Sequence, residues 1–212
     1  MTITWYGHSC FRLENKDTSI LIDPFSSEIG LRPPKIKDNI VLVTHQHYDH
    51  NNIEGLPQES FLAQGPGEYE VKNIFIKGIQ SYHDKNQGRE RGLNTIYVIK
   101  MDEMTLVHLG DFGEEKLSEE QVEKIGDVDI LMIPVGGVYT INYKEAVGVI
   151  HQIEPKVVIP MHYKIDGLKV DIDGPEKFLK EMGLTPEKTE KVYKIQSKNL
   201  PAEEMRLVLF NL

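Results

Sequence analysis

Short apolar runs recur along the chain and predict β-strands. A run that is too apolar to alternate indicates a strand covered on both faces. Residues 2–6 and 205–210 instead alternate apolar and polar side chains, which predicts outer or one-sided strands. The continuous runs are Ile20–Ile22, Ile40–Val43, Ile74–Ile76, Thr95–Ile99, Thr105–Val107, Ile130–Ile133 and Val157–Ile159.

Three helices are predicted in the second half of the chain. Residues 118–121 have the sequence of a capping box, in which a serine and a glutamine side chain bind the free backbone N–H groups of the first turn. Asn142 begins a second helix that Pro155 closes, and a third has Pro175 in its first turn and Gly183 as its stop. Strands interleaved with helices predict an α/β protein.

Length and charge narrow the choice of architecture and partner. The chain has 212 residues, 40% of them hydrophobic, so we expect one globular domain over residues 1–212. Its 24 Lys and Arg residues and 33 Asp and Glu residues give a formal charge of -9, which disfavours a nucleic acid substrate. Bound divalent cations could invert this charge locally. Oligomeric state is not predicted, because sequence pattern does not separate surface from core apolar residues.

The first residues and the single cysteine bear on the compartment. Met1–His8 has no cationic start followed by an apolar stretch, and no later run approaches the ~20 apolar residues that cross a bilayer. We therefore expect a cytoplasmic protein without a membrane partner. Cys10 has no partner for an internal disulfide, and a buried small apolar role is favoured over a redox role.

The strongest chemical signal follows the run Ile40–Val43. His45, His47, Asp49 and His50 place four metal-ligand side chains within six residues. Because side chains alternate along an extended chain, the first two can hold one cation, and the turn that follows can direct the other two at a second. A solvated histidine-rich loop is the alternative, which the dense spacing after an apolar strand disfavours.

One loop does not complete two coordination spheres, so we expect further ligands at the ends of other strands, where α/β sheets bind their ligands. His83, Asp111 and His162 each stand just past an apolar run. Each alone would more often be an ordinary polar residue, but together with residues 45–50 they predict a metal centre. His151 lies inside the second predicted helix without a partner and is assigned no function.

The pattern His-x-His-x-Asp-His at residues 45–50 resembles the metallo-β-lactamase superfamily. By this resemblance His83 would be the third histidine of the first metal, Asp111 would bridge both metals, and His162 would be the last ligand of the second. The resemblance also implies a four-layer αββα sandwich, with two sheets packed face to face, helices outside, and the site at one edge.

Four other segments resemble the UlaG-like and metal-dependent hydrolase branch of that superfamily, namely Trp5–Ser9, Ile22–Pro24, Ile133–Thr140 and Ile159–Tyr163. The charged loop from Asp84 to Leu93 matches no member of known specificity, which leaves the substrate open. The chain also has no long insertion like the RNA-binding arm of the transfer-RNA-processing members.

These features predict a hydrolase with two divalent cations that share a water. The cations would lower the pKa of that water from about 15.7 toward ~7, and the resulting bridging hydroxide would attack a small-molecule ester, lactone, amide or phosphodiester bond. Asp49 would orient the water or carry its proton. Nitrogen and oxygen ligands without cysteine suit Zn²⁺, with Mn²⁺ or Fe²⁺ as alternatives. The first cation is assigned His45, His47 and His83, the second Asp49, His50 and His162, and both Asp111.

Four further side chains have an open role. His8 and His108 could orient metal ligands by hydrogen bonding or could be structural histidines. Asp23 could likewise orient a ligand or could cap the turn that follows it. Tyr139 could offer its hydroxyl group to the substrate or could belong to an ordinary glycine turn.

Two other functions stay open. A di-iron redox enzyme would use the same ligand types, although such members of the superfamily resemble a pattern with glutamate in place of His47 and usually carry a flavin domain. A non-catalytic, metal-bound binding module would keep the ligands without turnover.

Overall fold

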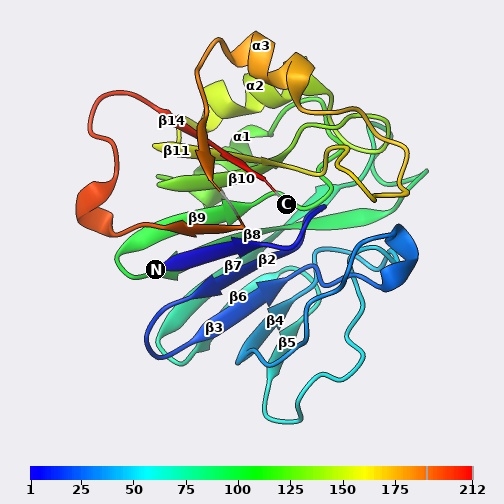
Figure 1. Cartoon of the computed structure of the whole chain (residues 1–212), viewed down its shortest axis with the longest axis vertical. Coiled ribbons are helices and arrows are strands. Elements are labelled where there is room, and N and C mark those ends of the chain that lie inside the picture. The colour runs from blue at the N-terminus through cyan, green and yellow to red at the C-terminus, as the bar shows by residue number, and fades with distance from the viewer. Residues whose placement is uncertain (190, 212) are drawn as a thin grey trace.

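Two β-sheets pack face to face in the computed structural model, which describes residues 1–189 and 191–211 (Figure 1). The first sheet has the order β13 (Val192–Lys194), β1 (Thr2–Trp5), β2 (Phe11–Glu14), β3 (Ser19–Ile22), β4 (Ile40–Leu42) and β5 (Phe61–Ala63). The second has the order β12 (Glu187–Thr189), β14 (Arg206–Phe210), β11 (Val157–Met161), β10 (Ile130–Pro134), β9 (Met104–His108), β8 (Leu93–Met101), β7 (Ile74–Tyr82) and β6 (Gly67–Val71).

The three predicted helices are confirmed, and they lie beside the second sheet at the top of Figure 1. They are α1 (Glu119–Ile125), α2 (Tyr143–Ile153) and α3 (Glu176–Met182). Ser118 and Asn142 each head a complete capping box, which satisfies free N–H groups of the first turn. Gly183 ends α3 with a φ of 65°, a left-handed conformation that glycine adopts at little cost.

The first sheet is covered on both faces, as its continuous apolar runs predict. Ile20 and Ile22 of β3 face the core between the sheets, whereas Leu21 faces a second apolar cluster that includes Phe25 and Leu168. Within the described residues this second cluster contains no α-helix residue. Loop residues and a short 3-10 helix, η1 (Ser27–Ile29), cover this face instead. The expected two-sheet sandwich is therefore present, with α-helices outside the second sheet and loops with one 3-10 helix outside the first.

The two segments with alternating apolar and polar side chains, residues 2–6 and 205–210, differ in their burial. In β1 the pattern is one-sided, because Ile3 and Trp5 are buried while the threonines between them are partly exposed. The same prediction is wrong for β14, whose residues 207–210 are all buried. β14 lies between β11 and β12 and has neighbours on both edges and both faces.

Strand direction brings the ends of three strands to one edge of the second sheet. β7 is antiparallel to β8, β8 is antiparallel to β9, and β9, β10 and β11 are mutually parallel neighbours. The carboxyl ends of β7, β9 and β11 therefore share an edge. The backbone N–H of Thr95 donates to the carbonyl of Thr44 at 2.9 Å, so the end of β4 in the first sheet reaches the same edge.

Two remaining features concern the compartment predictions. Cys10 is buried, and burial raises the pKa of its thiol well above the usual value, in agreement with a small apolar role. No helix among residues 1–189 and 191–211 has the length and apolar character needed to cross a membrane.

A buried ion pair ties β2 to the segment that precedes β4. The guanidinium group of Arg12 donates to both carboxylate oxygens of Asp38, at 2.8 and 2.9 Å, and to the carbonyl of Lys35 at 2.7 Å. The side chain of Asp38 is fully buried, and that of Arg12 is 6% exposed. Such a pair is costly to break because the remaining charge lacks a partner.

We predict that Asp38→Ala lowers the free energy of unfolding by about 3–5 kcal/mol, since it leaves the buried guanidinium group of Arg12 unpaired. Urea denaturation followed by circular dichroism measures this change. Asp173→Ala, which removes the partner of Lys177 in an exposed ion pair, serves as the control and should leave the urea midpoint unchanged. Equal shifts in the two variants would contradict the prediction.

Candidate metal centre

The structure brings all seven predicted ligands into one cluster at the shared edge. Ligand atoms within 4.8 Å of one another form three overlapping groups. The groups are His45 with His47 and His83; His8 with Asp49, His50 and His162; and His45 with His50 and Asp111. The first two groups correspond to the two cation positions that the sequence predicts, with His8 added to the second.

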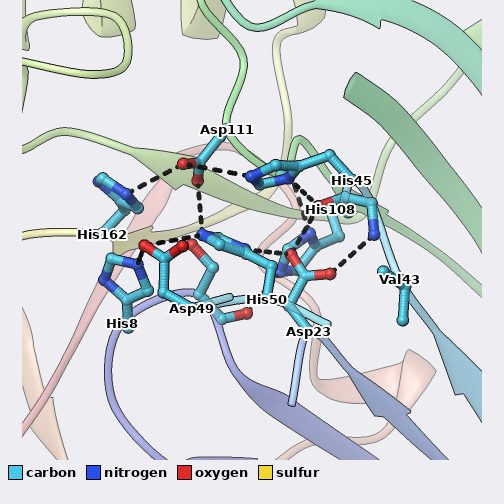
Figure 2. Close-up of polar contacts among 12 residues, drawn as sticks. His8, Asp23, Val43, His45, Asp49, His50, His108, Asp111 and His162 are labelled. Atoms are coloured by element: carbon cyan, nitrogen blue, oxygen red, sulfur yellow. Dashed lines mark hydrogen bonds and ion pairs between the residues drawn. The ribbon is translucent and has the colours of Figure 1, made fainter. Parts of the chain in front are cut away.

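Asp111 stands between the two groups (Figure 2). One of its carboxylate oxygens, Oδ2, lies 3.2 Å from Nε2 of His83 and 3.2 Å from Nε2 of His162. The other, Oδ1, lies 3.3 Å from Nε2 of His50. A carboxylate in contact with imidazoles of both groups has the position expected of a bridging ligand.

Asp23 determines how two of the imidazoles are presented (Figure 2). Its Oδ2 accepts hydrogen bonds from Nδ1 of His50 at 2.9 Å and from the hydroxyl of Thr44 at 2.7 Å. The same hydroxyl accepts from Nδ1 of His45 at 3.0 Å. With both Nδ1 atoms used as donors, Nε2 is the nitrogen of each ring that is left to bind a cation. Of the two roles open for Asp23, the contacts agree with orienting ligands.

The structure gives His8 and His108 different kinds of contact. Nε2 of His8 lies 3.1 Å from Oδ2 of Asp49, and its ring centroid is 4.2 Å from that of His162. His108 uses both ring nitrogens on backbone, since Nε2 donates to the carbonyl of Ser9 at 2.9 Å and Nδ1 accepts from the N–H of Gly110 at 3.1 Å. His8 therefore contacts a candidate ligand, whereas the contacts of His108 are those of a structural histidine.

The donor set fits a bound divalent cation. Nε2 of His45 is buried without a hydrogen bond in the described part of the chain, and Nε2 of His50 and Oδ1 of Asp111 are buried with only their 3.3 Å contact to each other. Buried polar atoms without partners are rare in folded proteins. Imidazole nitrogens and carboxylate oxygens that converge in this way are the ligands that Zn²⁺ and similar ions take.

The pKa values of three histidines favour the neutral imidazole that binds metal. Burial and the neighbouring His162 lower the pKa of His8 to about 4. Burial and His50 lower the pKa of His45 well below its usual value, and burial and His83 lower that of His47. These rings are therefore neutral at pH 7, as a ligand must be.

Neighbouring histidines keep the carboxylates ionised, although burial favours their protonated form. Burial works to raise the pKa of Asp111, but His162 and His50 outweigh burial and hold that pKa well below its usual value. Burial acts in the same direction on Asp49, where the hydrogen bond with His8 and the charge of His50 lower the pKa. Burial works to lower the pKa of His50, but Asp111 and Asp23 raise it well above the usual value. A cation would displace that proton.

Two residues of the cluster, His8 and His162, and their neighbour Asp23 have left-handed backbone conformations. Asp23, His8 and His162 have φ values of 48°, 55° and 51°, which cost most non-glycine residues about 1–3 kcal/mol each. Val138 has a φ of 62°, which is rarer still for a β-branched residue. Strain of this kind persists only where surrounding contacts enforce it, and it is common at functional sites.

A cavity of about 510 Å³ opens onto the cluster. The candidate ligands that line it are His47, Asp49, His83, Asp111 and His162. The remaining lining residues are Tyr48, Arg91, Tyr139, Lys169, Val170 and Asp171. Tyr139, whose role the sequence leaves open, therefore lies at the cavity with 40% of its surface exposed.

Sequence reasoning missed several residues of the site. Thr44 precedes the histidine motif directly, and its hydroxyl group was the available signal. Asn94 lies within β8 and gave no sequence signal of a role at the site. Its Oδ1 accepts from the N–H of Asp111 at 3.0 Å. Arg91, Lys169 and Tyr48 come from loops whose approach to the cluster depends on tertiary packing.

A model described as a beta-lactamase superfamily domain matches residues 2–162 of this chain. A UPF0173 metal-dependent hydrolase of Thermoplasma volcanium is 33% identical over 199 residues, covering 80% of this chain and 86% of its own. A UPF0173 protein of Pyrococcus furiosus is 32% identical, with 86% of this chain and 90% of its own covered.

Solved structures give the same grouping. A crystal structure from Thermotoga maritima, described as a candidate Zn-dependent hydrolase of the metallo-beta-lactamase superfamily, superposes with a TM-score of 0.77 at 33% identity. The match covers 99% of this chain and 97% of the other. A metallo hydrolase of Ignicoccus hospitalis, at 23% identity, covers 86% of this chain and 90% of its own with a TM-score of 0.60, which supports the fold alone.

We predict that Asp23→Asn weakens metal binding about 10–100-fold, because Asp23 accepts on both oxygens, Oδ1 from the backbone N–H of Thr44 and Oδ2 from the Thr44 hydroxyl and Nδ1 of His50, whereas an amide has one accepting oxygen. Competition against a chromogenic chelator measures the affinity. His151→Gln is the control, since His151 is exposed on α2, outside the candidate ligand groups. Unchanged affinity in Asp23→Asn would exclude an orienting role for this carboxylate.

Proposed function

Because this chain belongs to the beta-lactamase superfamily and its relatives are named metal-dependent hydrolases, we propose that it is a metal-dependent hydrolase with a binuclear centre. Its substrate would be a small molecule with an ester, lactone, amide or phosphodiester bond. The proposal is carried by one observation, the two ligand groups with Asp111 between them.

The residues at hand would hold two cations. His45, His47 and His83 would bind the first, and Asp49, His50 and His162 the second, with Asp111 in contact with both. Their nitrogen and oxygen atoms suit zinc, and the similarity to the Thermotoga maritima protein adds weight to zinc over manganese or iron. When bound, the two cations would supply hydroxide at neutral pH and polarise the substrate oxygen.

Asp49 is the candidate for moving the proton. Its side chain is 14% exposed and lines the cavity, so a substrate can approach it. The contact with Nε2 of His8 orients the carboxylate and, with His50, keeps it ionised. An ionised carboxylate at the cavity can accept a proton from water during attack and return it to the leaving group.

The cavity favours a small molecule. Its volume of about 510 Å³ lies within the range of about 300–1,000 Å³ that is usual for small-ligand sites. Tyr48, Tyr139 and Val170 add aromatic and apolar surface to the otherwise polar lining. A formal charge of -9 disfavours long polyanions such as nucleic acids.

Elemental analysis of protein purified without chelators tests the centre. We expect about two equivalents of metal in the wild type, and less in both His47→Ala and Asp111→Ala, because each removes a ligand. Metal content that neither substitution changes would exclude the cluster as the site. Iron as the only metal in protein from native cells would favour the di-iron redox alternative.

Asp49→Asn tests catalysis in a panel of esters, lactones, amides and phosphodiesters. The amide keeps an oxygen ligand but accepts protons poorly, so we expect kcat to fall about 10²–10⁴-fold with metal retained. Asp173→Asn, on the exposed surface, is the matched control. A metal-loaded wild type that hydrolyses none of these bonds would favour the non-catalytic binding module.

A further inference from the structure

One buried carboxylate organises the loop of residues 84–92, which directly follows the candidate ligand His83. Asp84 directly follows His83 and is 3% exposed. Its Oδ1 accepts from the backbone N–H groups of Asn86 and Gly88, and its Oδ2 accepts from those of Glu90 and Arg91, at distances of 2.7 to 3.0 Å. Four hydrogen bonds to one side chain fix the path of this charged loop.

The loop is also closed against its neighbours. The N–H of His83 donates to the carbonyl of Gly92 at 3.1 Å, which joins the two ends of the loop. Gly113 packs so tightly behind it that an added Cβ would lie 2.3 Å from the carbonyl carbon of His83. Lys85 pairs with Glu145 at the start of α2. The loop therefore holds its side chains in place relative to His83.

This loop directs Arg91 into the cavity. The guanidinium carbon lies 5.7 Å from the centroid of the Tyr139 ring, a cation–π contact that fixes one face of the guanidinium group. Among the described residues its only ion-pair partner is the exposed Glu90, at 4.0 Å, and its side chain donates no hydrogen bond. The N–H groups at the edge of the guanidinium plane are free to bind a ligand.

Lys169 supplies a second cation on the same cavity. Its backbone N–H donates to the carbonyl of Ile29 at 2.8 Å, which anchors this segment to η1. Within the part of the chain that the structure describes, its ammonium group has no ion pair, and Asp171, which lines the same cavity, pairs with neither Lys169 nor Arg91. Arg91, whose one ion-pair partner among the described residues is the exposed Glu90, and Lys169 thus line the cavity of a protein whose formal charge is -9.

Cationic side chains beside bound metal ions repel them unless an anion lies between. We propose that Arg91 and Lys169 bind an anionic group of the substrate, a carboxylate or a phosphate, in the cavity that opens onto the candidate metal ligands. The identification of this anion as part of a substrate rests on the proposed hydrolase function. The guanidinium group suits either anion, because two parallel N–H donors match two oxygens of a carboxylate or phosphate.

Calorimetric titration of the metal-loaded protein tests the subsite with inorganic phosphate, with benzoate, and with benzyl alcohol as the neutral counterpart of benzoate. We expect Arg91→Gln to weaken anion binding about tenfold and Lys169→Gln to weaken it less, because a charged bidentate contact is worth more than a point charge. Benzyl alcohol should bind equally to all variants. Metal content and melting temperature, measured beside each titration, show whether the variants fold and load.

Arg89→Gln is the matched control, because it removes one positive charge from the same loop at an exposed residue that does not line the cavity. Weaker phosphate binding alone would support a phosphate group, and weaker benzoate binding alone a carboxylate. Unchanged binding in Arg91→Gln, or equal loss in Arg89→Gln, would overturn the subsite. If anion binding depends on Arg91 but the protein has no hydrolytic activity, the result would contradict the proposed function and support the subsite.

Discussion

The candidate centre depends on how one buried carboxylate distributes its hydrogen bonds. Asp23 receives the backbone N–H and the hydroxyl of Thr44 together with Nδ1 of His50, and through that hydroxyl it also reaches His45. One imidazole of each ligand group is thereby held in the tautomer that presents Nε2. These contacts help to offset the cost of the left-handed backbone at Asp23.

The layered fold converts separate strand ends into a single site. β7, β9 and β11 run in the same direction, so His83, Asp111 and His162 emerge at one edge of the second sheet. The first sheet is held against that edge by polar contacts as well as by the core. The hydroxyl of Tyr97 donates to the carbonyl of Val43 at 3.1 Å, immediately before the histidine motif. Placement of the ligands is thus a property of sheet packing, and their fine orientation is a property of hydrogen bonding.

The sequence predicts the site where its signal is local. Residues 45–50 contain closely spaced ligand side chains directly after an apolar strand. The helices are predicted by their capping residues. Asp23 could not be assigned in advance, because its donors lie 21 and 27 positions along the chain. Arg91 could not be placed, because its direction comes from the contacts of Asp84. Short strands with charged or glycine residues, such as β2 and β6, carry too little apolar pattern to be seen.

The ligand groups draw on both sheets, since residues 45–50 extend the first and Asp111 and His162 extend the second. Cations bound between them would act as cross-links that must be released before the sheets can separate. A ligand present at 100 times its dissociation constant adds about 2.7 kcal/mol to folding, and the bond would also slow unfolding. In a cell short of metal, this chain would lose its reaction centre and its resistance to proteolysis together, so its lifetime would follow the metal supply.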